Sequence, residues 1–589
     1  MPECWRNTMS KLNVDQKTIK NLLSDNKADF LIPDYQRPYA WDAEKECFTL
    51  WEDVFAFAIP EGDADRFDRT TAEYYLGPIV TFKNDNGQME IIDGQQRLTT
   101  IMLLLRAFYS RFEKMKDKQS QLLREMIGKC IWKTDEFDQP DMNLLKINSE
   151  VATDKDKEEF LAILKDGIVN EKMKSRYAEN FRFFQGKIDE FVADYPAYFP
   201  YLPSRFLNNC ILLPIEADVQ DTALRIFSTL NNRGKALSDA DIFKAEFYKY
   251  YSKLGKKDDF IKRWRKLEEI CEKHLHSNSG APMDELFSRY MYYERAKKGI
   301  KRSTTEALRS FYGANNYALL QSDETLYNME LLADFWNDVY SMSDDRFSQR
   351  VLRQLFVLNY APNSMWTFFV SVYFLCNKDA NNQLDDEKFY KFLTKSIAFI
   401  WAYAITNPGV NALRTPVYAE MVNIINGKEV DFAEFRFPQQ QTANQFDNYN
   451  FYNGRPITKS MLVWWCMQDD KQERPSLDTI FEIEHIYARN RYDMEKSLSS
   501  KDVVEMLGNK SILEKRINIR ASDFRFGDKK KYYNGYTTSK GDEKKATCVE
   551  ELKQLAKTKT DFAETDIKER TNTILKAFGK FLDEQGLIK

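Results

Sequence analysis

The stretch Ile91-Ile92-Asp93-Gly94-Gln95-Gln96-Arg97-Leu98-Thr99-Thr100 decides the fold of the N-terminal third of the chain. An apolar run at residues 76–82 suits a buried strand, and the turn Asn84-Asp85-Asn86-Gly87 tolerates the positive φ of a hairpin. Residues 89–92 are predicted to form the returning strand. Apolar residues recur at helical spacing from Leu98 onward. Residues 93–97 are therefore expected where a strand ends and a helix begins.

Such a junction suits an anion, because unpaired backbone amides and the helix dipole attract negative charge there. Gly94 lets the backbone approach a ligand, Arg97 offers a planar fork for phosphate, and Asp93 is able to hold a divalent cation. The alternative is a polar connection with Arg97 in a surface ion pair. Local physics leaves these two interpretations level.

Two further blocks break the tie. Before the junction stands Ile32-Pro33-Asp34-Tyr35-Gln36-Arg37-Pro38-Tyr39-Ala40-Trp41, and after it stands Phe227-Ser228-Thr229-Leu230-Asn231-Asn232-Arg233-Gly234-Lys235-Ala236-Leu237-Ser238. The three blocks, in this order, closely resemble the ParB-like NTPase domain of GmrSD-type (type IV) restriction systems. The resemblance covers residues 12–250, with a helical insertion at about 102–195.

The resemblance implies a site for a nucleoside triphosphate, GTP or ATP, with Asp93 and Arg97 active in hydrolysis. Residues for nucleotide binding or sensing are Tyr35, Gln36, Arg37, Gly94, Gln95, Gln96, Asn231 and Arg233. Pro33 and Pro38 restrict the backbone around the first three of these. That segment either lines the nucleotide pocket or touches DNA. We favour a pocket-lining position with a share in sensing, because rigidity suits a preorganised site.

Composition indicates an ordinary cytoplasmic protein of three or four domains. Charged residues make up 30% of the 589 and hydrophobic residues 43%. The eight cysteines stand singly, without a Cys-x-x-Cys pair, so neither a disulfide framework nor a zinc ribbon is predicted. The first residues lack the layout of a signal peptide, and the longest apolar stretches are too short to span a bilayer. No membrane association is expected.

The formal charge of −4 gives no global signature of nucleic-acid binding. Basic residues nevertheless gather between residues 509 and 531, where a local patch can follow a phosphate backbone. They are Lys510, Lys515, Arg516, Arg520, Arg525, Lys529, Lys530 and Lys531. Charge alone favours a solvated face, whereas a nuclease context makes Lys510, Lys529 and Lys530 candidates for DNA binding.

The middle of the chain, from Asp241 to about residue 426, has a helical pattern throughout. Residues 238–241 look like a capping box that opens its first helix. Aromatic and aliphatic stripes at residues 352–358 and 389–405 are interpreted as packing surfaces. Polar stretches at 407–415 and 435–442 predict a connector into the last domain.

A second site is indicated by Phe481-Glu482-Ile483-Glu484-His485-Ile486. The chain has three histidines, and His274 and His276, near Cys271, fit a polar helix end better than a metal cluster. His485 follows a β-type alternation, a helix is expected at 502–507, and Gly508 and Asn509 follow. Strand, histidine, helix, asparagine and basic tail resemble the HNH (ββα-metal) nuclease domain of the same GmrSD family, from about residue 477 to 533. Ala488, Asp523 and Glu484 depart from the family's usual Pro, Asn and Asp.

Phosphodiester cleavage assigns roles to these residues. A neutral imidazole, His485, is suited to take a proton from water. Glu484 and Asn518 supply oxygen ligands that suit Mg²⁺ or Mn²⁺. Asn509 is placed to orient the His485 ring or the scissile phosphate, and Lys530 to neutralise a neighbouring phosphate.

The sequence thus predicts an α+β, predominantly helical chain of three parts. These are a ParB-like α/β NTPase and sensor domain (12–250), a helical domain (251–440) and a C-terminal HNH nuclease domain (441–589). The resemblance implies an endonuclease of bacterial antiviral defence that cuts modified double-stranded DNA under nucleotide control. A homodimer is one oligomeric state that the sequence leaves open. The opposing hypothesis is a nucleotide-gated DNA-binding regulator whose nuclease site has decayed.

Overall fold

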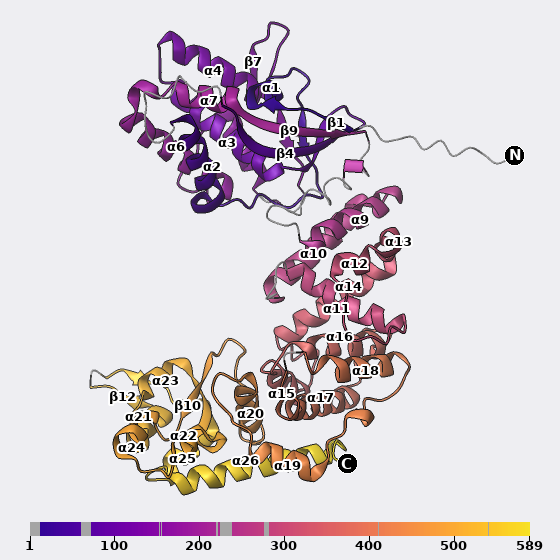
Figure 1. The fold of residues 1–589 in the computed structure, drawn as a ribbon, viewed down its shortest axis with the longest axis vertical. Helices are drawn as coiled ribbons and strands as arrows, with labels where there is room; N and C mark the ends of the chain where they lie inside the picture. Colours follow the sequence, from indigo (N-terminus) through magenta and orange to yellow (C-terminus); the bar gives the residue numbers. More distant parts are fainter. Residues whose placement is uncertain are drawn as a thin grey trace, which may run out of the picture. The chain divides into compact units, whose positions relative to one another are not determined.

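The computed structural model describes residues 12–59, 72–151, 154, 156–218, 222–223, 238–275, 282–409, 411–539 and 541–589 (Figure 1). The chain divides into two compact units, Met1–Arg265 and Lys266–Lys589. It is α+β and predominantly helical, as predicted. Among the described residues, no helix combines the length and apolar character needed to cross a bilayer. The finer division into three domains stays a prediction.

A mixed sheet forms the centre of the first unit. The described strands follow the order β1-β9-β4-β5-β3-β8, with β2 also on β9. Their bounds are Leu12–Val14 (β1), Lys17–Thr18 (β2), Phe30–Ile32 (β3), Tyr74–Lys83 (β4), Met89–Asp93 (β5), Ile147–Ser149 (β8) and Cys210–Ala217 (β9). β4 and β5 pair antiparallel, whereas β4 and β9 pair parallel. The predicted hairpin is thus confirmed as the middle of the sheet.

Helices cover one face of this sheet, and in Figure 1 several of them lie together on one side of β4 and β9. They are α1 (Ile19–Leu23), α2 (Phe48–Ala58), α3 (Gln95–Phe112), α4 (Lys118–Ile131), α5 (Lys157–Asp166), α6 (Arg176–Asp194) and α7 (Tyr201–Asn209). Ile79 and Ile91 join α3 in the main core, whereas Val80 and Ile92 enter a smaller cluster with Tyr35. Both faces are therefore buried, which explains the continuous apolar runs.

The sequence predicted a helical insertion at about 102–195, but this region is not purely helical. It also contains a hairpin of β6 (Trp132–Thr134) and β7 (Pro140–Leu145). Its third strand, β8, extends the central sheet by pairing parallel with β3. The region is therefore part of the domain core. These strands were not predicted because β6 and β8 have three residues each, too few to show a periodicity, and the six residues of β7 are half-buried or exposed.

Helices predominate after the first sheet. They are α9 (Asp239–Lys253), α10 (Lys257–His274), α11 (Pro282–Lys297), α12 (Leu308–Tyr312), α13 (Ala314–Tyr317), α14 (Asp323–Tyr340), α15 (Gln349–Leu358), α16 (Met365–Asn377), α17 (Asp386–Thr406) and α18 (Arg414–Ile425). Ser238 and Asp241 form the predicted capping box of α9. The stripes of α15 and α17 are buried, so their interpretation as packing surfaces is confirmed.

The C-terminal part places two antiparallel strands among helices. β10 (Phe481–His485) pairs with β11 (Lys510–Glu514). The helices are α19 (Gln439–Asp447), α20 (Pro456–Cys466), α21 (Arg489–Glu495), α22 (Lys501–Glu505), α23 (Lys515–Ala521), α24 (Phe526–Asn534), α25 (Glu550–Thr558) and α26 (Glu564–Glu584), and β12 (Tyr536–Thr537) pairs with β13 (Glu543–Lys544). The stretch 435–442, predicted as a connector, already contains the start of α19.

Gly508 shows how tightly α26 packs against the turn before β11. Its N–H donates to Thr571 Oγ1 at 2.9 Å. A Cβ on Gly508 would clash with the Ile567 carbonyl oxygen and lie 2.5 Å from the Thr571 nitrogen. Helix backbone is unable to give way at such contacts, so this position requires glycine.

Gly508→Ala is expected to lower the free energy of unfolding by roughly 1–3 kcal/mol, the range for overpacking a dense core. Gly579→Ala is the matched control, because that α26 glycine has open space around its Cβ position. It should raise stability by about 0.5–1 kcal/mol through helix propensity. Urea unfolding followed by tryptophan fluorescence measures both, and equal stability of the two variants would contradict the packing argument.

Candidate functional site

The junction between β5 and α3 has the predicted geometry. Gly94 adopts φ 90°, which a side chain rarely allows, and a Cβ there would lie 3.1 Å from the Pro78 carbonyl oxygen. Arg97 extends back across β4, where its NH1 donates to that same oxygen at 2.8 Å. Its guanidinium lies so close to Gly77 that a Cβ would meet it at 2.8 Å. Gly94 and Gly77 therefore allow the turn and the Arg97 side chain to lie close to β4.

Burial disfavours the charged forms of the side chains at this junction. It raises the pKa of Asp93, while the Gly94 N–H, Arg97 and Arg37 act in the opposite direction. Burial likewise lowers the pKa of Arg97, which Asp93 opposes. The structure therefore brings Arg37, Asp93 and Arg97, three predicted site residues, into one electrostatic group.

The glutamines of the two motifs hold the motifs together. Gln95 Nε2 donates to the Arg37 carbonyl oxygen at 3.2 Å. Gln96 spans the next residues, since its Nε2 donates to the Pro38 oxygen at 3.1 Å and its Oε1 accepts from the Ala40 N–H at 2.7 Å. Gln36 Nε2 donates to the Ile92 oxygen at 3.0 Å. Gln95 and Gln96 are both buried and position the segment 37–40, and their part in nucleotide binding or sensing stays a prediction.

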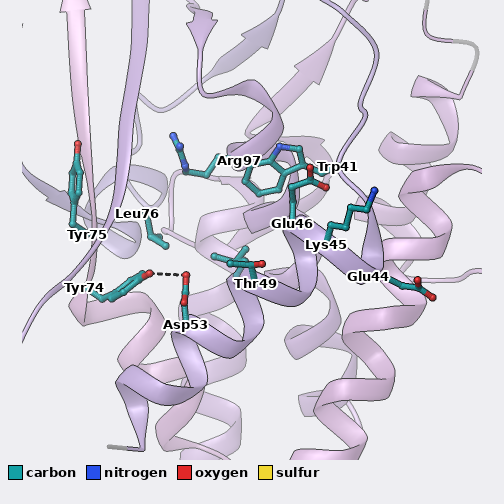
Figure 2. A pocket seen from close by; sticks show the side chains of 11 residues that line it. Trp41, Glu44, Lys45, Glu46, Thr49, Asp53, Tyr74, Tyr75, Leu76 and Arg97 are labelled. Carbon is teal, nitrogen blue, oxygen red and sulfur yellow. Dashed lines mark hydrogen bonds between the residues drawn. The ribbon is translucent and has the colours of Figure 1, made fainter. Parts of the chain in front are cut away.

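A pocket of about 520 Å³ opens beside Arg97 (Figure 2). Trp41, from the end of the first motif, lines it next to Arg97, and Tyr74 donates to Asp53 at 2.8 Å on its far side. The remaining lining residues are Glu44, Lys45, Glu46, Thr49, Leu50, Tyr75 and Leu76. Aromatic rings and charges of both signs therefore converge on the arginine of the second motif.

Tyr35 faces the opposite side of the sheet. Its hydroxyl donates to Glu90 at 2.8 Å, and its ring lies 4.8 Å from that of Tyr248 in α9. Asp34 pairs with Lys257 of α10 at 2.7 Å. The first motif therefore connects the strand that ends in Asp93 to the helices that follow. Asn231 and Arg233, the remaining predicted residues, lie outside the described residues.

His485 stands at the end of β10, opposite Lys510 of β11. Its side chain is 10% exposed, and its Nε2 has no hydrogen-bond partner within the described chain. Nε2 lies 3.7 Å from Glu505 Oε2, longer than a hydrogen bond. The imidazole is thus held at a strand end with one nitrogen uncommitted.

Glu505 organises the charges around His485, and the sequence analysis missed it. Its Oε2 accepts from Lys510 at 2.7 Å, and its Oε1 lies 2.8 Å from Arg489 NH2. Burial would raise the pKa of Glu505, but the Lys510 ammonium holds that pKa well below its usual value. The signal for this cluster was the antiparallel pairing of β10, which ends at His485, with β11, which begins at Lys510.

Burial lowers the pKa of His485, an effect that Glu505 opposes and that Arg489 and Lys510 reinforce. The ring is therefore neutral near pH 7, the form in which imidazole accepts a proton.

Asn509 is a positioning residue. It is fully buried, and its Oδ1 accepts from the Tyr487 N–H at 2.7 Å. Its Nδ2 donates to the carbonyl oxygens of Tyr487 and Val504 at 3.0 and 2.9 Å. These bonds fix the backbone just after His485. The predicted role of Asn509 in orienting the His485 ring or the scissile phosphate stays a prediction, since its hydrogen bonds in this structure all go to backbone atoms.

Glu484 and Asn518 are not brought together as metal ligands. Glu484 is buried, where it accepts from Lys529 at 2.8 Å and from the Tyr533 hydroxyl. Asn518 donates instead to Glu482 at 3.0 Å. No group of three or more His, Cys, Asp or Glu side chains able to hold a metal occurs in the described part of the chain. Both side chains thus have protein partners in this structure, and their predicted role as metal ligands stays a prediction.

Two of the three predicted DNA-binding lysines are in the core. Lys510 is fully buried, and Lys529 also donates to the His485 carbonyl oxygen at 2.7 Å. Lys530 donates to the Lys559 carbonyl oxygen at 2.9 Å. The exposed basic residues of the run are Lys515, Arg516, Arg525 and Lys531.

The sheet domain of the first unit and the C-terminal part around His485 each match the model of a known family. The model of the GmrSD restriction endonuclease N-terminal domain matches residues 19–248, and that of the C-terminal domain matches residues 438–577. Together these ranges cover more than half of the chain, which belongs to the GmrSD restriction endonuclease family. It is a nuclease that acts on DNA in restriction. No curated protein matches the chain.

Glu484→Gln is expected to lower the free energy of unfolding by roughly 3–5 kcal/mol, because it leaves the buried Lys529 ammonium without its counter-charge. Glu482→Gln is the matched control on the same face of β10. Its side chain is 39% exposed, so a change within about 0.5 kcal/mol is expected. Chemical denaturation compares the two, and a stable Glu484→Gln protein would show that the ion pair is dispensable.

Proposed function

We propose that the chain is a cytoplasmic, nucleotide-regulated HNH endonuclease that cuts modified foreign DNA in antiviral defence. The observation that carries this proposal is the neutral, buried His485 with an uncommitted Nε2 at the end of β10. An imidazole in that state is suited to general-base catalysis of phosphodiester hydrolysis. Double-stranded DNA and a nucleoside triphosphate are its proposed partners, and a homodimer stays a prediction.

The surrounding residues explain how the histidine is held. Lys529 binds the His485 carbonyl oxygen, and Asn509 binds the Tyr487 backbone on both its N–H and C=O sides. The base is therefore fixed from both directions along the chain, as a preorganised site requires. A decayed nuclease site would have no need of this support, so the enzyme is favoured over the DNA-binding regulator.

Dependence on Mg²⁺ or Mn²⁺ remains part of the proposal on the strength of the resemblance. The residues of this chain do not support Glu484 and Asn518 as its ligands, because Glu484 is neutralised by Lys529. We therefore derive no step through a metal, and the chemistry assigned to this chain is the proton transfer at His485.

The pocket beside Arg97 supports a nucleotide site in the N-terminal domain. Trp41 offers a ring for stacking a base, and Arg97 and Lys45 offer charge to phosphates. Tyr35 and Asp34 supply the link to regulation, since they contact α9 and α10, which follow the predicted nucleotide-sensing residues Asn231 and Arg233 in the chain. GTP and ATP are both candidates.

His485→Ala is expected to reduce DNA cleavage by roughly 10²–10⁴-fold while NTP hydrolysis continues, because a general base contributes about that factor. Plain, glucosylated and phosphorothioated DNA are incubated with and without each NTP and Mg²⁺, and cleavage is followed on gels. His274→Ala controls for the loss of a histidine. Undiminished cleavage by His485→Ala would remove the nuclease assignment from this site.

The pH profile of the same reaction should have its acid limb below about 6.5, the ordinary histidine pKa. Burial destabilises the imidazolium, so the active neutral form persists to lower pH. An acid limb above that value would contradict His485 as the base.

Asp93→Asn and Arg97→Ala should each lower NTP hydrolysis without lowering His485-dependent cleavage chemistry in Mn²⁺. The first removes a charge from the buried group formed with Arg37 and Arg97, and the second removes the guanidinium from the pocket. Asp85→Asn, on the exposed hairpin turn, is the control. Phosphate release measures hydrolysis, and normal rates in both variants would make the junction purely structural.

A further inference from the structure

Arg489 is a half-exposed cation held beside the proposed base. It is the first residue of α21, and its side chain is 50% exposed. Its NH2 lies 2.8 Å from Glu505 Oε1, whereas the other carboxylate oxygen lies 3.7 Å from His485 Nε2. One carboxylate therefore links Arg489 to His485 and leaves the remaining guanidinium N–H groups free to face solvent.

The charge balance around Glu505 leaves a surplus of positive charge. Lys510 Nζ donates to Glu505 and to the Phe451 carbonyl oxygen, and its side chain has no exposed surface. Lys510 thus neutralises Glu505 but is unable to reach a ligand. Since His485 is neutral, the charge of Arg489 is uncompensated within this cluster. A phosphodiester, which carries one negative charge, complements it.

His485 provides an independent indication of a ligand. Its side chain is nine-tenths buried, yet Nε2 has no partner in the described chain. A buried polar atom without a partner costs free energy, which a bound water or ligand removes.

We propose that Arg489 binds the phosphodiester that is cleaved, and that Glu505 is the positioning residue that holds this arginine beside His485. The inference rests on the proposed nuclease function. The oxygen of a water molecule forms a bond to phosphorus and gives its proton to His485, and the bond from phosphorus to the leaving oxygen breaks. Arg489 stabilises the charge that accumulates on the non-bridging oxygens, and the leaving oxygen takes a proton from solvent.

Arg489→Ala is expected to lower the cleavage rate by about 10²–10³-fold, as removal of one preorganised donor to a developing oxyanion does. Arg489→Lys should fall between it and the wild type, because lysine keeps the charge but not the planar fork. Added guanidinium should partly restore cleavage by Arg489→Ala. The substrate is whichever of the plain, glucosylated or phosphorothioated DNAs the wild type cuts.

Arg350→Ala is the matched control. Arg350 lies outside the basic run, its side chain is also about half exposed, and it is also paired with a glutamate, but with Glu387 rather than Glu505. It should cut within a few-fold of the wild-type rate. Thermal unfolding should be nearly unchanged in both arginine variants, because exposed ion pairs contribute little to stability.

A second measurement is independent of cleavage. In a His485→Ala background, Arg489→Ala should reduce the slope of log binding constant against log salt by about 0.9, the change for one lost phosphate contact. Glu505→Gln should lower kcat more than it raises KM, since it releases Arg489 without removing it. It should also shift the acid limb of the pH profile downward, because Glu505 raises the pKa of His485 against Arg489 and Lys510.

The outcomes separate the two proposals. Loss of cleavage in His485→Ala together with wild-type cleavage and an unchanged salt slope in Arg489→Ala overturns this inference alone. Unchanged cleavage in His485→Ala overturns the proposed function as well. Loss of cleavage in both His485→Ala and Arg489→Ala, with partial rescue by Arg489→Lys or by added guanidinium, supports Arg489 as a catalytic residue.

Discussion

The buried pair of Glu484 and Lys529 is the interaction on which the nuclease half depends. Taking two charges out of water is costly, and hydrogen bonds to the buried groups offset part of that cost. Lys529 donates to both Glu484 and the His485 carbonyl oxygen, and Tyr533 donates its hydroxyl to the same carboxylate. The end of β10 therefore has one allowed position relative to α24. That constraint fixes the direction in which His485 projects from the strand.

In the N-terminal domain, neutral side chains hold the site residues in position. Gln36, Gln95 and Gln96 bind backbone atoms of the opposite motif, so strand, turn and proline-bracketed segment form one body. Amides cost less to bury than charges, and the charged side chains of this body include Arg37, Asp93 and Arg97. Tyr35 belongs to the same body, because its hydroxyl donates to Glu90 of β5, the strand that ends at Asp93.

The sequence predicted the elements better than the contacts. Hairpin, helix start and capping box were all readable, because Asn84 to Gly87, Leu98 and Ser238 act through local geometry. β8 was not, because its place in the sheet depends on pairing with β3, over a hundred residues away. The motif residues Gln95, Gln96 and Asn509 were given ligand roles, although their amides hold backbone. A motif marks where residues are constrained without separating those that touch a ligand from those that hold its neighbours.

The basic run at 509–531 makes this limit concrete. Counted along the chain, Lys510 and Lys529 look identical to Lys515 and Arg516. Burial divides them, because the first two neutralise Glu505 and Glu484 while the other two face solvent. Lys510 and Lys529 thus offset the charges of the two carboxylates near His485, whereas Lys515 and Arg516 have exposed side chains. Lys510 is buried beside Glu505 because the fold places it opposite His485. The pairing of β10 with β11 provides that arrangement.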